Sequence, residues 1–166
     1  MITLRLATLS DIPLIQEVAE STWPISYREI ISPEQIRYML DNMYNSTKIG
    51  EAITDPEQAF WLAEENGKVL GFCGIEHGYS EQAITRIHKL YILPDTQGSG
   101  LGKILMDHVE NEAKKHGSTK LHLNVNKQNK AVGFYQKHGF VTDYEEVLDI
   151  GNGYVMDDYV MIKSIQ

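Results

Sequence analysis

A glycine-rich stretch between an expected strand and an expected helix is the part of this sequence whose residue types most directly indicate chemistry. Residues His88–Leu93 favour a β-strand, Pro94 follows them, and an amphipathic helix pattern begins at Leu101. The first N–H groups of a helix have no partner within it and carry the positive end of the helix dipole, so phosphate oxygens bind there. We therefore predict an anion site built by the backbone of Gln97, Gly98, Ser99, Gly100, Leu101, Gly102 and Lys103.

The spacing of these glycines excludes two familiar phosphate motifs. A dinucleotide-binding fingerprint requires a glycine where Lys103 stands, and a P-loop requires Ser or Thr where Ile104 stands. The pattern that remains, Gln97-x-x-Gly100-x-Gly102, resembles the pyrophosphate-binding signature of the GNAT acetyltransferases. This family transfers an acetyl group from acetyl-coenzyme A to an amine.

A second block, residues 129–140, resembles the same family. Its pattern there is Asn-x-x-Ala-x-x-Phe-Tyr-x-x-x-Gly-Phe, after the fifth strand. The matching residues of this chain are Asn129, Val132, Phe134, Tyr135, Gly139 and Phe140, while the alanine falls at Ala131 instead. Because both blocks occur in the expected order, the chain is identified as a member of this family.

The resemblance implies positions for the cosubstrate and one catalytic role. The backbone of Leu90, Tyr91 and Ile92 would pair with the pantetheine arm as if it were an added strand, and the amides from Gln97 to Lys103 would hold the pyrophosphate. Tyr135 matches the general acid, since a phenol with an ordinary pKa of about 10 stays protonated at neutral pH. The other implied contacts are Asn129 on the arm, Phe134 packed against it, and Lys137 near the nucleotide phosphates.

The proton acceptor for the attacking amine is left open by the sequence. An ammonium has no lone pair, so a base must remove its proton, directly or through water. Some family members place a glutamate on the fourth strand where Arg86 stands here. His88 shares a strand face with Arg86 and has a suitable pKa range, and Glu76 and His77 are rivals. Cys73 is interpreted as core, because the family transfers the acetyl group directly in a ternary complex.

The elements that must position these residues follow from hydrophobic periodicity and turn signals. The sequence predicts the order βααβββαβαββ, an α/β (α+β) arrangement in which a mixed, mostly antiparallel seven-stranded sheet is flanked by helices; this is the element order of the GNAT fold. The expected helices start near Ser10, Ser32, Leu101 and Asn129, with a further short helix at 47–54 and the first ending near Trp23-Pro24. The expected strands are 2–7, 59–63, 68–77, 84–93, 120–125, 140–148 and 158–163.

Length and charge bound the remaining possibilities. The 166 residues are expected to form one domain, residues 1–166. A net charge of −8 argues against nucleic-acid binding, and no apolar run approaches a membrane span. The single cysteine excludes an internal disulfide and a cysteine-based zinc site, and no metal is expected. Without a recognisable leader the protein is expected to be cytoplasmic, and a homodimer is left open.

The acceptor is predicted from the closest likeness within the family. The aromatic segment before SPEQIRYML and the two blocks above resemble bacterial spermidine/spermine N-acetyltransferases, which implies a polyamine or another small primary amine as partner. Trp23, Tyr27 and His77 are the predicted substrate contacts. Two alternatives stay open: acetylation of a protein or peptide amine, and a non-catalytic domain that binds acetyl-CoA as a sensor or interaction module.

Overall fold

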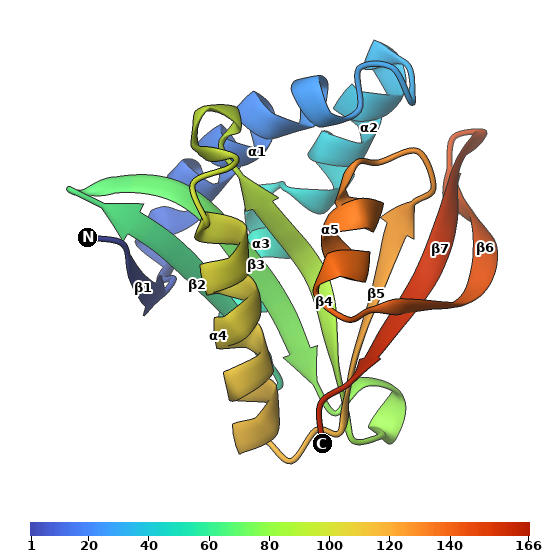
Figure 1. The fold of residues 1–166 in the computed structure, drawn as a ribbon. Coiled ribbons are helices and arrows are strands. Elements are labelled where there is room, and N and C mark those ends of the chain that lie inside the picture. The colour runs from blue at the N-terminus through green and yellow to red at the C-terminus, as the bar shows by residue number, and fades with distance from the viewer.

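The computed structural model describes residues 1–166 and contains one seven-stranded sheet in the order β1-β2-β3-β4-β5-β7-β6 (Figure 1). Only the β4–β5 pair is parallel; the other neighbours are antiparallel. The strands are β1 Thr3–Leu6, β2 Gln58–Glu65, β3 Lys68–His77, β4 Ile84–Ile92, β5 Lys120–Asn126, β6 Val141–Gly151 and β7 Tyr154–Ser164. The predicted mixed, mostly antiparallel sheet is confirmed.

Five α-helices cover the two faces of the sheet. They are α1 Ile12–Ser26, α2 Pro33–Met43, α3 Ser46–Thr54, α4 Leu101–Lys115 and α5 Ala131–Lys137, with short 3-10 turns at Leu9–Asp11, Tyr79–Glu81 and Pro94–Thr96. Three helices therefore precede β2, one more than in the predicted order βααβββαβαββ. The third is the short helix expected at 47–54. None of the helices is both long and apolar enough to cross a membrane.

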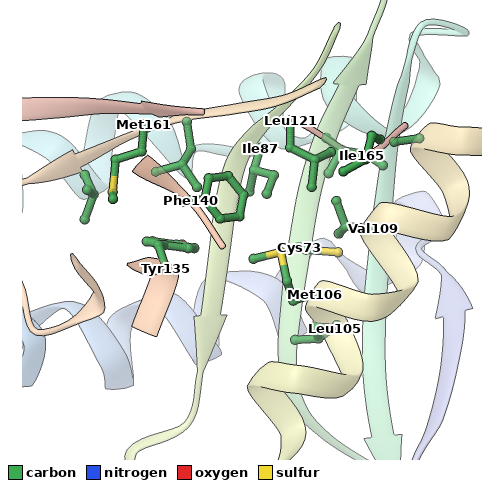
Figure 2. Close-up of a cluster of buried hydrophobic side chains, with 14 of the residues drawn as sticks. Cys73, Ile87, Leu105, Met106, Val109, Leu121, Tyr135, Phe140, Met161 and Ile165 are labelled. Atoms are coloured by element: carbon green, nitrogen blue, oxygen red, sulfur yellow. The ribbon is translucent and has the colours of Figure 1, made fainter. Parts of the chain in front are cut away.

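Two hydrophobic cores lie on opposite faces of the sheet. The first core packs α4 and α5 against the sheet and contains Leu105, Val109, Tyr135, Phe140 and Met161 among its buried residues (Figure 2). The second core packs α1, α2 and α3 against the other face and contains Trp23, Tyr27, Leu40, Phe72 and Met156. Both faces of the sheet are thus packed against helices, which fixes the position at which neighbouring strands separate.

The first helix runs further than the sequence predicted. Its last turn includes Pro24 and ends at Ser26, although a proline disfavours helix at the residue before it. The reason is packing, since the Trp23 ring is 1% exposed and lies between Tyr27 and Tyr91 at centroid distances of 4.6 and 5.6 Å. The predicted end near Trp23-Pro24 was therefore two to three residues too early.

Tight turns fix the two hairpins. Asn66 and Gly67 have φ of 53° and 78°, and Asn152 and Gly153 have 55° and 79°, as a two-residue hairpin of mirror-image type requires. The second turn starts the β6–β7 ladder at once, so β7 begins at Tyr154 rather than at the predicted residue 158. Met156, in the added part of the strand, packs in the second core, where Gln35 of α2 donates to its sulfur at 3.7 Å.

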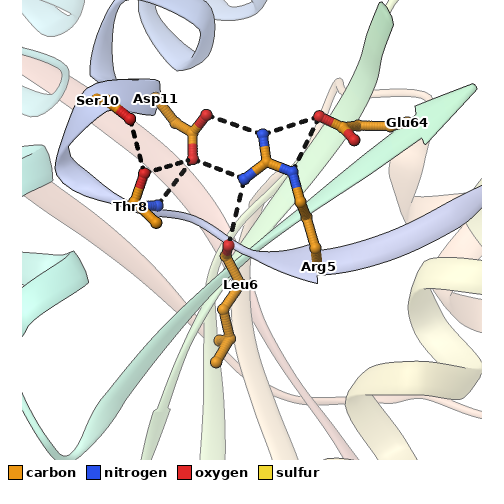
Figure 3. Close-up of polar contacts among 6 residues, drawn as sticks. All are labelled: Arg5, Leu6, Thr8, Ser10, Asp11 and Glu64. Atoms are coloured by element: carbon orange, nitrogen blue, oxygen red, sulfur yellow. Dashed lines mark hydrogen bonds and ion pairs between the residues drawn. The ribbon is translucent and has the colours of Figure 1, made fainter. Parts of the chain in front are cut away.

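A polar network joins the N-terminal strand to the start of the first helix (Figure 3). The Arg5 guanidinium donates to both Asp11 carboxylate oxygens at 2.8 Å and to Glu64 on β2. Asp11 is 5% exposed and also accepts from the Thr8 amide at 2.8 Å. Every oxygen of this buried carboxylate therefore has a donor, which anchors β1 and α1 to the sheet.

Candidate active site

An opening between β4 and β5 is the central feature of the site. The parallel pairing covers only four residue pairs and stops at Ile87 and Leu123, although both strands continue. Beyond that point Lys89–Ile92 have no strand partner on the β5 side. A strand edge with free N–H and C=O groups can bind an extended ligand as an added strand, and the backbone of Leu90, Tyr91 and Ile92 lies on this edge.

An irregularity in the β3–β4 pairing marks the start of this opening. Ile75 pairs with Ile87 and Gly74 pairs with Lys89, so His88 is one extra residue on β4. Such a bulge bends a strand and interrupts its alternation. Ile87 and Leu90 consequently both lie on the first-core side, whereas Tyr91 packs in the second core.

The glycine loop presents a run of unpaired amides. Gly98 and Gly100 have φ of +86° and +87°, a conformation that favours glycine. The amides of Gly98, Gly100, Leu101, Gly102 and Lys103 donate no hydrogen bond within the chain. These five free N–H groups lie at the N-terminus of the 15-residue helix α4, an arrangement that favours an anion.

Glycine is also required at Gly102 by a neighbouring aromatic ring. A Cβ at this position would lie 2.9 Å from Phe134 Cε1, closer than real Cβ contacts. The ring of Phe134 therefore packs directly on the glycine loop, which joins the two sequence blocks in space. Lys137 is exposed on α5, and the Lys103 ammonium is paired with Asp107 at 2.5 Å.

Tyr135 points into the first core with its hydroxyl free of hydrogen bonds within the chain. It lies near Cys73 and Phe140 (Figure 2), and its side chain is 7% exposed. Burial raises the pKa of this phenol, so it keeps its proton at any physiological pH. Burial also raises the pKa of the Cys73 thiol to about 12, which makes Cys73 a poor nucleophile and agrees with its interpretation as core.

Aromatic hydroxyls and an amide meet on the other side of the opening. The Tyr27 and Tyr91 hydroxyls lie 3.0 Å apart, and Asn129 Nδ2 donates to Tyr27 Oη at 3.4 Å. Asn129 Oδ1 accepts from the Ala131 amide at 2.9 Å and so fixes the start of α5. Tyr27 is thereby placed at the opening, whereas Trp23 lies behind it in the second core, with no surface for the substrate contact that was predicted.

The two strand candidates for the base contact each other. His88 Nε2 and Glu76 Oε1 lie 2.7 Å apart, and both side chains are about one third exposed, at 32% and 31%. Burial lowers the pKa of His88, while the Glu76 carboxylate raises it. The pair is therefore an imidazole with a carboxylate partner, which can accept a proton near neutral pH.

His77 does not join this group. Its ring is 7% exposed and stacks on His116 at a centroid distance of 3.7 Å, and its Nδ1 bonds Thr85 Oγ1 at 2.9 Å. These contacts lie at the C-terminal end of α4, on the face opposite Tyr27. The prediction of His77 as a substrate contact, and as a rival base, is corrected, because alternation along β3 turns it away from Glu76.

Several polar residues that the sequence analysis did not select surround the same sheet face. A pocket of about 460 Å³ is lined by Tyr79, Arg86, His122, Asn124, Asp143, Tyr144 and Glu146, among others. Arg86 donates to His122 and to Asn124 Oδ1 at 2.8 and 2.9 Å. Lys89, just beyond the bulge, is half-buried with its ammonium over the Tyr44 ring, and burial lowers its pKa to about 8. For these residues, the only signal in the sequence was a polar side chain at a strand position that faces inward.

Fold and site together define a class of protein in which two diverging strands of a mixed sheet lie beside a helix N-terminus with free amides. A family model described as an acetyltransferase (GNAT) domain matches residues 27–160. The chain belongs to the GNAT acetyltransferase family, and it is an N-acetyltransferase with acetyl-CoA as cosubstrate.

Individual relatives agree with this assignment. An uncharacterized N-acetyltransferase of Mycobacterium tuberculosis (strain ATCC 25618 / H37Rv) is 29% identical over 158 residues, covering 95% of this chain and 99% of that protein. Peptidyl-lysine N-acetyltransferase YjaB of Salmonella typhimurium is 36% identical over 120 residues, 69% of this chain and 74% of that protein. The structure of the PaiA N-acetyltransferase of Thermoplasma acidophilum in complex with coenzyme A superposes with a TM-score of 0.85 at 25% identity and 99% coverage of both chains.

Proposed function

We propose that this enzyme acetylates the primary amine of a small cationic molecule, a polyamine in the first instance, by direct attack on acetyl-CoA. The observation that carries the transfer reaction is the β4–β5 opening, with the five free amides of the glycine loop beside it and the Tyr135 hydroxyl in the adjoining core. The cationic acceptor is supported by the net charge of −8 and by the carboxylates on the open sheet face.

The cosubstrate contacts that we propose follow the geometry from strand to loop to helix. The backbone of Leu90, Tyr91 and Ile92 binds the pantetheine arm, and an N–H of this strand polarises the acetyl carbonyl. The amides between Gln97 and Lys103 hold the pyrophosphate. Asn129 bonds the arm through its amide and Phe134 packs on it, while Lys137, which is exposed on α5, approaches the nucleotide phosphates.

The catalytic roles that we propose use two separate groups that transfer protons, the His88–Glu76 pair and the Tyr135 phenol. The thioester of acetyl-CoA supplies the activated acetyl group. His88, supported by Glu76, takes the proton from the acceptor ammonium, directly or through water, so that the nitrogen lone pair can form the C–N bond. Tyr135 gives its proton to the sulfur as the C–S bond breaks, and the second proton, which the nitrogen loses as the amide forms, restores the phenol. Its raised pKa makes Tyr135 a group that is protonated before each turnover.

A lysine side chain of a protein or peptide is the second candidate acceptor. The similarity to a peptidyl-lysine N-acetyltransferase favours it, and a lysine ε-amine presents the same aliphatic ammonium as a polyamine. A sensor that binds acetyl-CoA without catalysis is disfavoured by the retained Tyr135 and by the His88–Glu76 pair. The cytoplasmic location and the homodimer stay predictions from the sequence.

An amine panel tests the proposal. Release of free CoA from acetyl-CoA is measured with putrescine, spermidine and spermine, and with amino-acid amides, aminoglycosides, lysine-containing peptides and peptide N-termini. We expect kcat/KM to be highest for the polyamines. An equal or higher value for the other amines would contradict the polyamine acceptor, and preference for lysine peptides would support the second candidate. Binding of CoA by calorimetry with no turnover of any amine would indicate the sensor.

A further inference from the structure

Asp158 is a buried carboxylate with one oxygen left without a hydrogen-bond donor. It lies on β7, is 5% exposed, and its Oδ2 accepts from Asn124 Nδ2 at 3.2 Å. The other oxygen, Oδ1, is buried and has no partner in the chain. Leaving a buried polar group unpaired is unfavourable, and for a charge the cost is larger still. Such a group in a folded domain requires an explanation.

The contrast with Asp11 shows that burial alone does not produce this situation. Asp11 is equally buried at 5%, but its two oxygens accept from Arg5 and from the Thr8 amide. Asp158 has no cation in hydrogen-bonding contact. Its neighbour across the β6–β7 ladder is a second carboxylate, Glu146, whose Oε2 accepts from the same Asn124 amide at 3.2 Å.

The position of Asp158 connects two parts of the site. Asn124 and Glu146, its two polar neighbours, line the 460 Å³ pocket on the open sheet face. On the other side of β7, Asp158 pairs with Asn126 of β5, three residues before Asn129, whose amide donates to Tyr27 at the β4–β5 opening. Asp158 therefore lies on β7 between Glu146, which lines the pocket, and the end of β5 that leads to Asn129 at the opening.

We infer that Asp158, held by Asn124 beside Glu146, receives an ammonium group of the acceptor and selects basic aliphatic amines. This inference rests on the proposed function and deepens it. An ammonium brings three N–H donors and a positive charge, so it donates to the unpaired oxygen and offsets the repulsion between the two neighbouring carboxylates. A neutral amide or hydroxyl supplies a donor without the charge. Arg86, bonded to the far side of Asn124, keeps the amide nitrogen turned toward the carboxylates.

The proton equilibrium of Asp158 agrees with this arrangement. Burial, together with the nearby Glu146, raises the pKa of the carboxyl, while Asn124 and Arg86 lower it. A bound cation would favour the ionised form and reverse the rise. In the absence of acceptor, the site is therefore held in a state that a cation stabilises.

The test compares Asp158→Asn with Asp157→Asn in the full chain. The asparagine keeps the size of the side chain and removes the charge, whereas Asp157 is a half-exposed neighbour that pairs with Lys127 at 2.9 Å. We expect Asp158→Asn to raise the KM for spermidine roughly 10- to 100-fold, the effect of losing a hydrogen bond to a charged group. The dissociation constant for CoA should be unchanged, and Asp157→Asn should leave both constants within about twofold.

Thermal unfolding separates recognition from a structural role. Removal of a buried carboxylate with a raised pKa should leave the Tm of Asp158→Asn equal to or above that of the parent. A lower Tm together with weaker CoA binding, or an unchanged KM for spermidine, would overturn the inference. Calorimetric titration of spermidine into the parent protein and into Asp158→Asn tests the inference separately from the proposed function. If no amine is acetylated but spermidine binding depends on Asp158, the proposed function is contradicted and the inference stands.

Discussion

His88 Nε2 lies 2.7 Å from Glu76 Oε1, so the two residues that the sequence offered as rival bases form one hydrogen-bonded pair across β3 and β4. The carboxylate raises the pKa of His88 against the lowering effect of burial. If His88 must be neutral to accept a proton, Glu76→Gln should move the acidic limb of the kcat/KM profile to lower pH. The profile with acetyl-CoA and spermidine measures this, because kcat/KM reports groups of the free enzyme.

The matched variant for this pair is His88→Gln. It should abolish the acidic limb and lower kcat/KM by about 10²-fold or more, the usual contribution of a general base. A limb that stays at the same pH in both variants would remove the pair from the proton transfer.

Tyr135→Phe tests the general acid. The substitution removes only a hydroxyl that has no hydrogen bond in the chain, so we expect an unchanged Tm. We expect kcat to fall by about 10²–10⁴-fold, with CoA affinity retained. Single-turnover CoA release and calorimetry with CoA measure the two effects. The control is Tyr154→Phe, whose ring packs at a tilt of 56° against Tyr38 with a centroid distance of 5.2 Å; it should leave kcat unchanged. Equal rates for both variants would contradict the role of Tyr135.

Gly102→Ala tests the contact between the glycine loop and α5. The new Cβ would meet Phe134 at 2.9 Å and Ile92 at 3.4 Å, so the ring must move. We expect the free energy of unfolding to fall by about 1–3 kcal/mol, as overpacking does, and CoA to bind more weakly. Urea unfolding and calorimetry measure these changes.

The control for this variant is Gly133→Ala, within α5. A Cβ there meets nothing within 4 Å, and alanine is the better helix former, so stability should rise by about 0.5–1 kcal/mol. Normal CoA binding by Gly102→Ala would show that the Phe134 ring does not support the cosubstrate.

Asp11→Asn tests the N-terminal network of Figure 3. The Arg5 guanidinium holds the pKa of the Asp11 carboxyl well below its usual range. The stabilisation is therefore complete above the unfolded pKa of about 3.9 and is lost as pH falls toward the folded value. At pH 7 we expect a loss of about 1–2 kcal/mol, a modest figure because the Arg5 side chain is 39% exposed and screened by solvent.

Urea unfolding of the parent and of Asp11→Asn at decreasing pH measures this dependence. The two curves should converge in acid, where the carboxyl takes up its proton. Asp41→Asn, which removes an exposed partner of Arg37, should stay within about 0.5 kcal/mol of the parent. A constant difference at every pH would show that the ion pair is not its source.

Local chemistry explains what could be predicted from the sequence. The glycine loop, the Asn66-Gly67 turn and the capping glycines at Gly117 and Gly139 are set by backbone conformations that few residues adopt, and the structure gives them positive φ as expected. Hydrophobic periodicity placed the elements and their order. Where tertiary packing overruled local preference, as at Pro24, the prediction of the helix end was wrong.

The sequence by itself determined the family, the element order and the anion loop, because each depends on residues close together in the chain. Only the tertiary structure decided which polar groups share a face. The bulge at His88 changes the alternation of β4, the stacking on His116 removes His77 from the site, and the β6–β7 turn brings Asp158 beside Glu146 and Asn124. These relationships depend on register and burial between distant segments, and no spacing within one segment encodes them.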